Sequence, residues 1–435
     1  MTFAPAPSAG AVTGKGLLNN IGENNCFLNV VIQALWHLDS FRTAFLGLGE
    51  SVHAHSTPAC VFCALQVLFT HYQLSEERAL PPDILRNALA DLFSSVPKFQ
   101  LRCLDDAAEA LDAVLSELHR ALAPPHAPAH PCACTAHMAF GMALTEQTVC
   151  DACGGTNAPL EIDQYVNYVY VTALRDMKQQ HPHDAFPVLI RRMLDADVRT
   201  CPRDEAPCGA SARIQRHVFN APSVYAIGLV WESPNPEVWE ILEMMEMVPM
   251  QMQLNDIYPL PHLHHYHLRG MICYYGLHYD AYFYNRALKQ WIVFDDTNVR
   301  EVGARWATIL ERCERGRYHP AVVFFERVGV SDPAAPLTLQ PYAAHMHRPT
   351  LPAQHIPAAR AGPVEENIHV IGAPHHSGTV SGSGVEATGM WERRQREAVR
   401  ALALQLEAER ERERQEEIRA RERARKERGV GVDVV

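Results

Sequence analysis

The 435-residue sequence contains no apolar run that approaches the roughly 18 to 20 residues of a membrane-spanning helix. Its first residues, "MTFAPAPSAGAVTGKG", lack the charged-then-apolar layout of a secretory signal. It also lacks a cationic excess, because 50 acidic residues against 39 lysines and arginines give a net charge of −11. We therefore expect a globular protein with no membrane span, located in the cytoplasm or the nucleus, whose main partner is not nucleic acid.

Parts of the chain lack the apolar residues that a folded core needs. Residues 1–13 are predicted to be a disordered N-terminus, and residues 329–385, rich in Pro, Ala, Gly and Ser, a disordered linker. Residues 386–428 mix opposite charges at helical spacing and have almost no apolar residue after Leu406. They predict a charged helix, either solvated or forming a coiled coil with a protein partner, before a tail at 429–435. The folded domain is therefore expected at 14–328.

Twelve cysteines are present, and in a reducing compartment they are more typical of metal binding or catalysis than of disulfide bonds. The segment "NNIGENNCFLNVVIQALWHL" places Cys26 between a polar turn and an apolar run. Apolar spacing over 27–45 predicts one buried helix with Cys26 in its first turn, where the helix dipole favours a thiolate. A buried structural cysteine is the alternative, so a nucleophilic role for Cys26 requires a base nearby.

A downstream segment offers that base. "MICYYGLHYDAYFYNRALKQWIVFDDTNV" predicts strands over 271–275, 278–284 and 290–294. If the last two strands pair as a hairpin, His278 at the start of one lies near Asp295 at the end of the other. A carboxylate there can hold the imidazole in the tautomer that accepts a proton from the thiol. Taken alone, His278 is more typical of an ordinary strand end and Asp295 of a turn.

Three segments resemble motifs of one family. "GLLNNIGENNCFLNVVIQALWHLDSFR" resembles the cysteine box of the ubiquitin-specific proteases, a family of ubiquitin carboxyl-terminal hydrolases, and "GLHYDAYFYNRALKQWIVFDDTNV" resembles their histidine box. "LDDAAEALDAVLSELH" resembles their Gln-Asp-x-x-Glu-Phe-Leu segment. The resemblance covers about residues 16–328 and points to a divergent animal branch. It implies an α+β, papain-like fold with a helical thumb, zinc-braced fingers at about 132–215 and a β palm.

The resemblance also implies an activity and its residues. It implies a cysteine-type deubiquitinase that hydrolyses the isopeptide bond after ubiquitin's C-terminal glycine, with ubiquitin and ubiquitinated proteins as partners. Cys26 matches the family's nucleophile, His278 its general base and Asp295 its orienting carboxylate. Asp106 and Glu109 match an acidic pair that binds the arginine-containing ubiquitin tail, which suits charge-assisted hydrogen bonding. A solvated helix face is the alternative for this acidic pair.

The sequence departs from the family pattern at several points. The turn before Cys26 is one residue longer, so the donor to the oxyanion is Asn19 or Asn20, of which we favour Asn19. Leu277 stands where the family commonly has the second of two glycines, and strand alternation predicts that it points away from the cleft while His278 points in. "VYAIGLVWES" replaces the family's usual Leu-Lys-Arg-Phe ending.

These departures leave two other functions open. One is a catalytically inactive ubiquitin-binding scaffold of the same fold. The other is a cysteine peptidase with a different substrate, which is less favoured because the acidic pair and the fingers cysteines would then lack a purpose.

Two cysteine pairs resemble the zinc-bearing fingers of the same family. Cys150 and Cys153 form "CDAC", and Cys201 and Cys208 form "CPRDEAPC", whose spacing is wider than usual. Four thiolates brought together predict a structural zinc, with reduced free thiols as the alternative. No catalytic cofactor is implied.

Two further clusters are weaker candidates for a second zinc site. They comprise His53, His55, Cys60 and Cys63 in one segment, and Cys132, Cys134 and His137 in another. Core packing is the alternative for the first cluster, and ordinary loop residues for the second.

Overall fold

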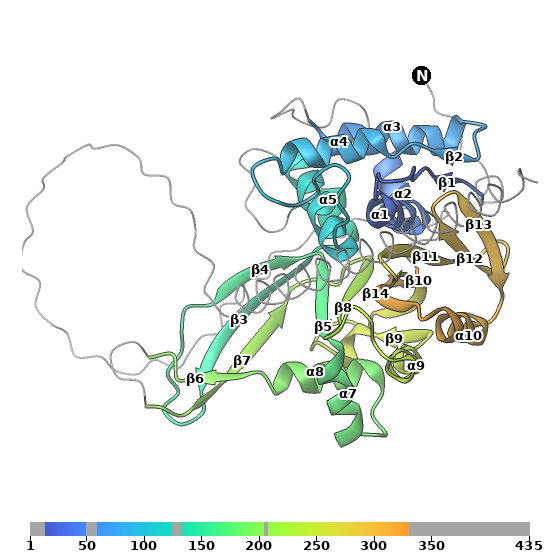
Figure 1. Ribbon diagram of the computed structural model, residues 1–435. Coiled ribbons are helices and arrows are strands. Elements are labelled where there is room, and N and C mark those ends of the chain that lie inside the picture. Colours follow the sequence, from blue (N-terminus) through green and yellow to red (C-terminus); the bar gives the residue numbers. More distant parts are fainter. Residues whose placement is uncertain (1–13, 49–58, 124–131, 133, 204–207, 330–435) are drawn as a thin grey trace, which may run out of the picture. The chain divides into compact units, whose positions relative to one another are not determined.

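The computed structural model describes residues 14–48, 59–123, 132, 134–203 and 208–329 (Figure 1). The chain divides into two compact units, 1–342 and 343–435, and every described residue belongs to the first. The predicted N-terminal segment, linker, charged helix and tail lie outside the described residues. Among the described helices, none is both long and apolar enough to cross a membrane.

The larger of the described sheets has eight strands, and we call it the palm sheet. Its strand order is β13-β12-β11-β10-β14-β8-β5, with β9 paired to β10, and every pairing is antiparallel except β5 with β8. The strands are β5 Val166–Tyr170, β8 Val224–Val230, β9 Gln251–Gln253, β10 His265–Tyr275, β11 His278–Asn285, β12 Gln290–Asp295, β13 Asn298–Gly303 and β14 His319–Arg327. Predicted strands at 278–284 and 290–294 match β11 and β12 closely, whereas the strand predicted at 271–275 begins earlier, at His265.

Helices cover both faces of the palm sheet, because its strands alternate apolar residues between two cores. Ile272 and Phe294 belong to one core with the helices that we call the thumb, and their neighbours Met271 and Val293 belong to the other. The thumb comprises α1 Cys26–His37, α2 Asp39–Leu46, α3 Val61–Leu74, α4 Asp83–Leu92 and α5 Ala107–Leu122. The opposite face carries α7 Val171–Gln180, α8 Phe186–Asp195, α9 Val238–Met247, a short 3₁₀ turn η1 Leu254–Asp256 and α10 Trp306–Gly316 (Figure 1).

The single helix predicted over 27–45 is wrong, because two helices occupy that range. Leu38 has an extended backbone, with φ −86° and ψ 102°, and separates α1 from α2. The Arg269 guanidinium, from β10, donates a 3.1 Å hydrogen bond to the carbonyl of His37, the last residue of α1. This tertiary contact satisfies a terminal carbonyl of α1, and the apolar spacing of the sequence does not reveal it.

A buried ion-pair network anchors the start of α2 to the palm sheet. Glu326 of β14 is fully buried and accepts hydrogen bonds from Arg269 at 2.8 Å and from the backbone N–H of Ser40 at 2.8 Å. Arg269 also donates to Asp39 at 2.9 Å. Removing one partner of such a pair typically costs about 3–5 kcal/mol, because the other charge is left buried and uncompensated. The network therefore fixes the thumb on the palm.

A separate four-stranded sheet, which we call the fingers sheet, has the order β4-β3-β7-β6. Its strands are β3 Met142–Cys150, β4 Leu160–Gln164, β6 Val198–Thr200 and β7 Ser211–Val218. Between β4 and β6 the chain returns to the palm to form β5, α7 and α8, so the fingers sheet is built from two separate stretches. Figure 1 shows it extending away from the thumb helices.

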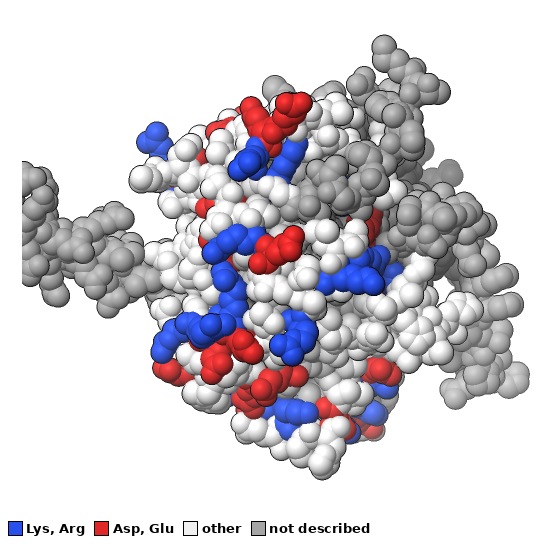
Figure 2. All heavy atoms as spheres, turned by 90° about the vertical axis from the view of Figure 1, so that its right-hand side faces the viewer, with Lys and Arg blue, Asp and Glu red and all other residues white. Residues whose placement is uncertain are grey.

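Charges are mixed on the face seen in Figure 2, which includes the side of β13 and α10 at the right of Figure 1. Lysines and arginines lie between aspartates and glutamates on this face, without a broad area of one sign. An ion pair on α10, between Arg315 and Glu311 at 3.8 Å, is an example. This face therefore does not offer the cationic surface that phosphate binding requires.

Candidate active site

Cys26 is the first residue of α1, as the sequence predicts, and only 2 % of it is exposed. The helix packs against β10, β11 and β12 of the palm sheet, so its N-terminus lies at the junction of thumb and palm. The unpaired N–H groups and the dipole of a helix N-terminus favour negative charge. Cys26 is thus placed at the positive end of the α1 dipole.

The structure brings His278 and Asp295 together. His278 is the first residue of β11 and Asp295 is the last residue of β12, and these strands pair antiparallel with Ala281 opposite Phe294. The distance between His278 Nε2 and Asp295 Oδ1 is 2.8 Å. This hydrogen bond lowers the pKa of the Asp295 carboxyl, which stays ionised and orients the ring.

His278 also reaches Cys26. Burial alone would lower the pKa of the His278 imidazole, but hydrogen bonds to Asp295 and to the Cys26 thiol raise it to about 10. Since Nε2 is bonded to Asp295, Nδ1 is the nitrogen that remains for the thiol. Three side chains from distant parts of the chain therefore form a connected Cys-His-Asp arrangement of the kind used in thiol catalysis.

A second aspartate, Asp296, was missed by the sequence reasoning. Its two carboxylate oxygens accept hydrogen bonds from Asn19 at 2.8 Å and from Asn29 at 2.7 Å, and it lies 4.0 Å from Nε2 of His278. Burial raises its pKa. Two signals could have found this network: Asp296 directly follows Asp295, and Asn29 lies one helical turn after Cys26.

Asn19 and Asn20, the two candidates for the oxyanion donor, lie in different environments. The Asn19 side chain is partly buried, and its Oδ1 accepts a 2.9 Å hydrogen bond from the backbone N–H of Asn25, next to the helix start. Asn20 is exposed, and both its backbone and its side chain donate to Glu23. Asn19 is thus the candidate that belongs to the hydrogen-bond network around His278.

Gly16 allows the strand before Asn19 to pack closely against the backbone of Asp296. A Cβ at Gly16 would lie 2.5 Å from the Asp296 carbonyl oxygen and 2.6 Å from Thr297 Cα, so only glycine allows this close approach. The strand is β1, Gly16–Leu17, which pairs in parallel with β2, Ala79–Leu80. Its Leu17 N–H donates to the Asp296 carbonyl at 3.0 Å, which holds the asparagine segment beside the β12–β13 turn.

The acidic pair, Asp106 and Glu109, lies at the start of α5. Asp106 is the N-cap of α5 and accepts hydrogen bonds from the backbone of Ala108 at 2.8 Å and Glu109 at 2.9 Å. Glu109 pairs with Lys98 at 3.0 Å. Burial raises the pKa of Tyr279 strongly, and the nearby Asp106 and Cys26 raise it further. Asp106 is therefore within electrostatic range of the residues around the nucleophile.

Leu277 lies in a turn, so the prediction from strand alternation does not apply to it. Tyr275 pairs with His278, and the two residues between them, Gly276 and Leu277, have φ values of +50° and +69°. Such a two-residue hairpin favours glycine at both positions. The Leu277 side chain is partly buried and packs against the core that contains Cys26. Its backbone is strained, which the sequence alone could not indicate.

The two fingers cysteine pairs converge at the far end of the fingers sheet. The Sγ atoms of Cys150 and Cys208 are 3.4 Å apart and those of Cys153 and Cys201 are 3.7 Å apart, with all four atoms within 4.8 Å of one another. Backbone N–H groups of Arg203 and Cys208 lower the pKa of the Cys201 thiol to about 6. The four cysteines can therefore hold a metal ion.

The glycines that follow the two pairs support this assignment. Gly154 and Gly209 come directly after Cys153 and Cys208 and have φ values of +65° and +72°. Left-handed turns of this kind can direct backbone N–H groups towards a ligand. In the first pair, the backbone N–H of Cys153 donates a hydrogen bond to the Cys150 thiol and lowers the pKa of that thiol. Both pairs thus have the backbone shape of a metal-binding turn.

The weaker clusters have different outcomes. Cys60 and Cys63 interact at the start of α3, and burial raises the pKa of Cys63 to about 11, whereas His53 and His55 lie outside the described residues. In the second cluster Cys132, Cys134 and His137 come together as one group, which gains a further member that the sequence reasoning missed, His119 of α5.

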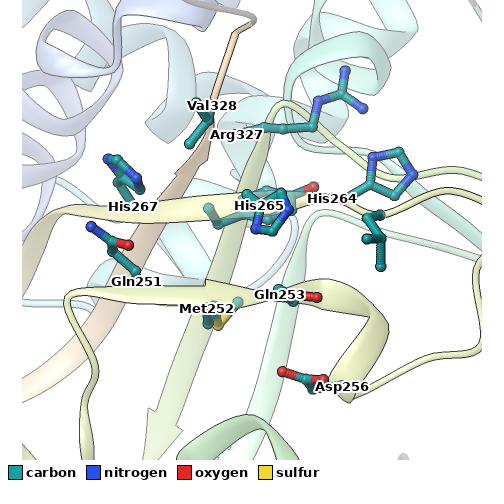
Figure 3. A pocket seen from close by; sticks show the side chains of 11 residues that line it. Gln251, Met252, Gln253, Asp256, His264, His265, His267, Arg327 and Val328 are labelled. Carbon is teal, nitrogen blue, oxygen red and sulfur yellow. The ribbon is translucent and has the colours of Figure 1, made fainter.

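A separate pocket of about 700 Å³ lies against β9 and β10, away from the catalytic residues. Figure 3 shows Gln251 and His267 at one end of it, and His264 and Asp256 at the other. None of Cys26, His278 and Asp295 lines it. It is therefore not part of the candidate active site.

Comparisons with known proteins identify the family of the chain. Residues 16–325 match the family model described as Ubiquitin carboxyl-terminal hydrolase. The mouse protein named Ubiquitin carboxyl-terminal hydrolase 54 is 36% identical over 339 residues, which cover 74% of this chain and 21% of that protein. The human protein named Ubiquitin carboxyl-terminal hydrolase 53 is 35% identical over 345 residues, covering 74% of this chain and 31% of that protein. The chain thus spans less than a third of either relative.

Solved structures share the fold. A SAGA DUB module that contains Ubp8, Sgf11, Sus1 and Sgf73 and is bound to monoubiquitin superposes with a TM-score of 0.53 at 15% identity, covering 75% of this chain and 71% of that chain. A yeast SAGA DUBm structure gives 0.52 at 16% identity, with the same coverage. The predicted α+β, papain-like fold is therefore confirmed. Because the family model matches most of the chain and the relatives are 35 to 36% identical, this protein belongs to the ubiquitin carboxyl-terminal hydrolase family.

Proposed function

We propose that this protein is a cysteine-type deubiquitinase, which removes ubiquitin from proteins or ubiquitin chains. The observation that supports this proposal most directly is the connected Cys26, His278 and Asp295 arrangement at the N-terminus of α1. Hydrolysis of an isopeptide bond requires a nucleophile, a base and a group that orients the base, and these three side chains supply them.

In the first half of the reaction, Nδ1 of His278 takes the proton of the Cys26 thiol. The thiolate attacks the carbonyl carbon of ubiquitin's C-terminal glycine, and the electron pair of the C=O bond moves onto oxygen. Backbone N–H groups at the start of α1 and the amide of Asn19 stabilise this oxyanion. As the intermediate collapses, the C–N bond breaks and His278 returns the proton to the leaving lysine amine.

In the second half, His278 acts as a base again. It takes a proton from water, whose oxygen attacks the thioester carbonyl. As the C–S bond breaks, His278 returns this proton to the Cys26 sulfur, and the released ubiquitin carboxylic acid ionises to the carboxylate by losing its proton to solvent. Asp295 remains ionised and keeps Nδ1 turned towards the sulfur throughout. The chemistry needs no metal or organic cofactor at this centre, because every proton transfer has a residue assigned to it.

Ubiquitin recognition is assigned to two regions of the chain. Asp106 and Glu109 at the start of α5 bind the cationic tail of ubiquitin, because carboxylates form charge-assisted hydrogen bonds with guanidinium groups. The fingers sheet supports the folded part of ubiquitin. The SAGA DUB module with monoubiquitin bound has the same fold, which supports ubiquitin as the partner.

We further assign one structural Zn²⁺ to Cys150, Cys153, Cys201 and Cys208. Tetrahedral coordination with Zn–S bonds of about 2.3 Å places sulfur atoms about 3.8 Å apart, close to the separations of 3.4 and 3.7 Å. Zinc would fix the end of the fingers sheet and take no part in catalysis.

All twelve cysteines lie in the described part of the chain, and none of them forms a disulfide there. Free thiols and thiolate metal ligands persist in reducing compartments. We therefore propose a cytoplasmic or nuclear location for this protein.

A ubiquitin probe with a C-terminal alkyne electrophile tests the proposal. We expect the wild-type chain to form a covalent adduct, seen as an increase in mass, and Cys26→Ala to form none. Cys103→Ser is the matched control, because Cys103 is exposed and has no part in the mechanism, and it should be labelled as readily as the wild type.

The same experiment distinguishes the scaffold function. A wild-type chain that binds ubiquitin, yet neither reacts with the probe nor releases a C-terminal fluorophore from ubiquitin, would be a ubiquitin-binding scaffold. The longer turn before Cys26 and the leucine at position 277 are the features that favour this second function. Labelling that persists in Cys26→Ala would instead show that the nucleophile is misassigned.

A further inference from the structure

A second group of metal-ligand side chains lies where the thumb meets the fingers. His119 is in the last turn of α5, Cys132 precedes the short helix α6 (Thr135–Ala139), Cys134 is the N-cap of α6, and His137 is inside it. One ligand atom from each lies within 4.8 Å of the other three. The sequence places three of them close together, whereas only the packing of α6 against α5 adds His119.

The distances within this group are those of ligands around one tetrahedral ion. His119 Nδ1 lies 3.5 Å from the Sγ atoms of both Cys132 and Cys134, and His137 Nδ1 lies 3.3 Å from Cys134 Sγ. A zinc ion with Zn–S of about 2.3 Å and Zn–N of about 2.0–2.1 Å would place sulfur and nitrogen about 3.5 Å apart. The agreement extends to atoms from separate helices, so it does not come from short sequence spacing alone.

The surroundings of His137 are those of a metal-bound histidine. Its Nδ1 lies 3.3 Å from Cys134 Sγ and 3.3 Å from the Tyr165 hydroxyl, while its Nε2 lies 3.1 Å from Oδ2 of Asp163 on β4. Metal-bound histidines usually direct their other ring nitrogen to a carboxylate or carbonyl, which fixes the tautomer and strengthens the ligand. Cys134 and His137 are each only 8 % exposed, so these polar atoms have little access to water.

We propose that His119, Cys132, Cys134 and His137 bind a structural Zn²⁺ ion, separate from the one at the end of the fingers sheet. Two thiolates and two imidazoles are a standard ligand set for structural zinc, and a closed tetrahedron leaves no position open for catalysis. The ion joins the end of α5 to α6, and Asp163 extends the connection to the base of the fingers sheet. It therefore braces the junction of thumb and fingers, independently of the proposed hydrolysis.

Metal analysis of the full chain, purified without chelators, tests this proposal by comparing the zinc content of variants with that of the wild type. We expect Cys134→Ser to contain about one zinc fewer per chain than the wild type, and Cys103→Ser to contain as much as the wild type. The double variant Cys150→Ser, Cys153→Ser should lose a different equivalent, so the two losses should add when the variants are combined. An unchanged zinc content in Cys134→Ser would overturn the proposal.

Two further variants guard against a loss of zinc that results from misfolding. His119→Gln removes a partly buried ligand without touching either cysteine, and it should also lose about one zinc while circular dichroism shows that the helices are retained. Asp163→Asn should keep the ion but release it to a colourimetric chelator about 10 to 100 times more readily. Full zinc retention in His119→Gln, or release from Asp163→Asn at the wild-type rate, would contradict the assigned ligands.

Cobalt substitution and thiol counting complete the test. With Co²⁺ in place of zinc, His119→Gln should lose the visible absorption of one tetrahedral site and keep the thiolate charge-transfer bands of the fingers site. Thiol counting before and after reduction addresses the competing explanation. A reducible disulfide between Cys132 and Cys134, with zinc content the same in wild type and Cys134→Ser, would show a redox pair and overturn the metal site.

Discussion

The palm and thumb on one side, and the fingers sheet on the other, are stabilised in different ways. The palm sheet is covered on both faces by extensive apolar cores, and the buried Arg269 and Glu326 pair fixes the thumb on it. At the cysteine end of the fingers sheet, the buried core among the described residues comprises Cys150, Cys201 and Ala212, with Ala210 packed against it, and all three residues of β6 are exposed. A sheet end with so little apolar burial needs another source of stability, which the proposed zinc ion would supply.

This difference matches the two tasks that the proposed function would require. Catalysis needs side chains held rigidly at short distances, and the palm and thumb provide this through packing. Support of a protein partner needs an extended surface, which cannot be buried in its own core. A metal ion can stabilise such a surface locally. It ties the ligand residues together, and the free energy of metal binding adds to the free energy of folding without requiring apolar contacts. Changes to the palm and to the fingers should therefore have separable effects.

The largest expected effect is loss of the catalytic residues in the palm and thumb. Cys26→Ala and His278→Ala should each reduce turnover of a fluorogenic ubiquitin substrate by at least about 10³-fold, because the residues act as a unit. Thermal unfolding and ubiquitin binding should change little, since Cys26 is one small residue of a large core and His278 is only partly buried. Turnover close to that of the wild type in either variant would refute the triad.

Asp295→Asn should have the next largest effect, a fall in turnover of up to about 10⁴-fold, because an amide favours the wrong imidazole tautomer. It also tests the electrostatics of the palm. The hydrogen bond to ionised Asp295 holds the pKa of His278 up, at about 10, so its removal should lower that pKa. His278 would then lose its proton at lower pH, and the alkaline limb of the residual activity should move to lower pH. A limb that stays in place would show that Asp295 does not set this pKa.

Removing the fingers metal tests the comparison from the other side. Cys150→Ser with Cys153→Ser should lose about one zinc per chain and increase hydrogen exchange in β3, β4, β6 and β7. Binding of ubiquitin should weaken, whereas alkylation of Cys26 by a small reagent should proceed at the wild-type rate. Increased exchange throughout α1 and the palm sheet would show that the two regions are not separable.

A smaller effect is expected from the acidic pair, tested by removing charge while preserving the fold. Asp106→Asn keeps a good helix cap, and Glu109→Gln keeps the size of the side chain. Each should raise KM for ubiquitin substrates by about 10-fold, the equivalent of one charge-assisted hydrogen bond, and leave kcat nearly unchanged. An effect that appears in kcat, or an unfolding temperature well below that of the wild type, would point to a structural role.

The smallest effect is expected from Leu277→Gly. A non-glycine residue in the left-handed region destabilises the folded state by about 1–3 kcal/mol, and glycine removes this cost. The gain offsets the packing energy that is lost with the partly buried leucine side chain. Stability should therefore be close to that of the wild type, where a strand position would have predicted a loss. Turnover should change only modestly, and a large gain in probe labelling would show that Leu277 obstructs the ubiquitin tail.

Local patterns in the sequence were sufficient to predict several features. Apolar spacing placed Cys26 at the start of a helix, and alternating residues placed β11 and β12 as a hairpin that brings His278 to Asp295. These predictions depend on neighbouring residues and on short turns. The end of α1 at His37 could not be predicted in this way, because the apolar spacing continues through Leu38 and the terminal carbonyl of α1 is satisfied by Arg269, more than two hundred residues away.

What the sequence determined by itself is the helix start that carries Cys26 and the strand ends that carry His278 and Asp295. Only the tertiary structure decided which of them meet. Asn19 and Asn29 bind Asp296 because β1 packs against the β12–β13 turn, a contact across more than two hundred and fifty residues of chain. His119 joins Cys132 and Cys134 because α6 packs on α5. Side-chain distances of about 3 Å are set by packing of whole elements, and no local pattern encodes them.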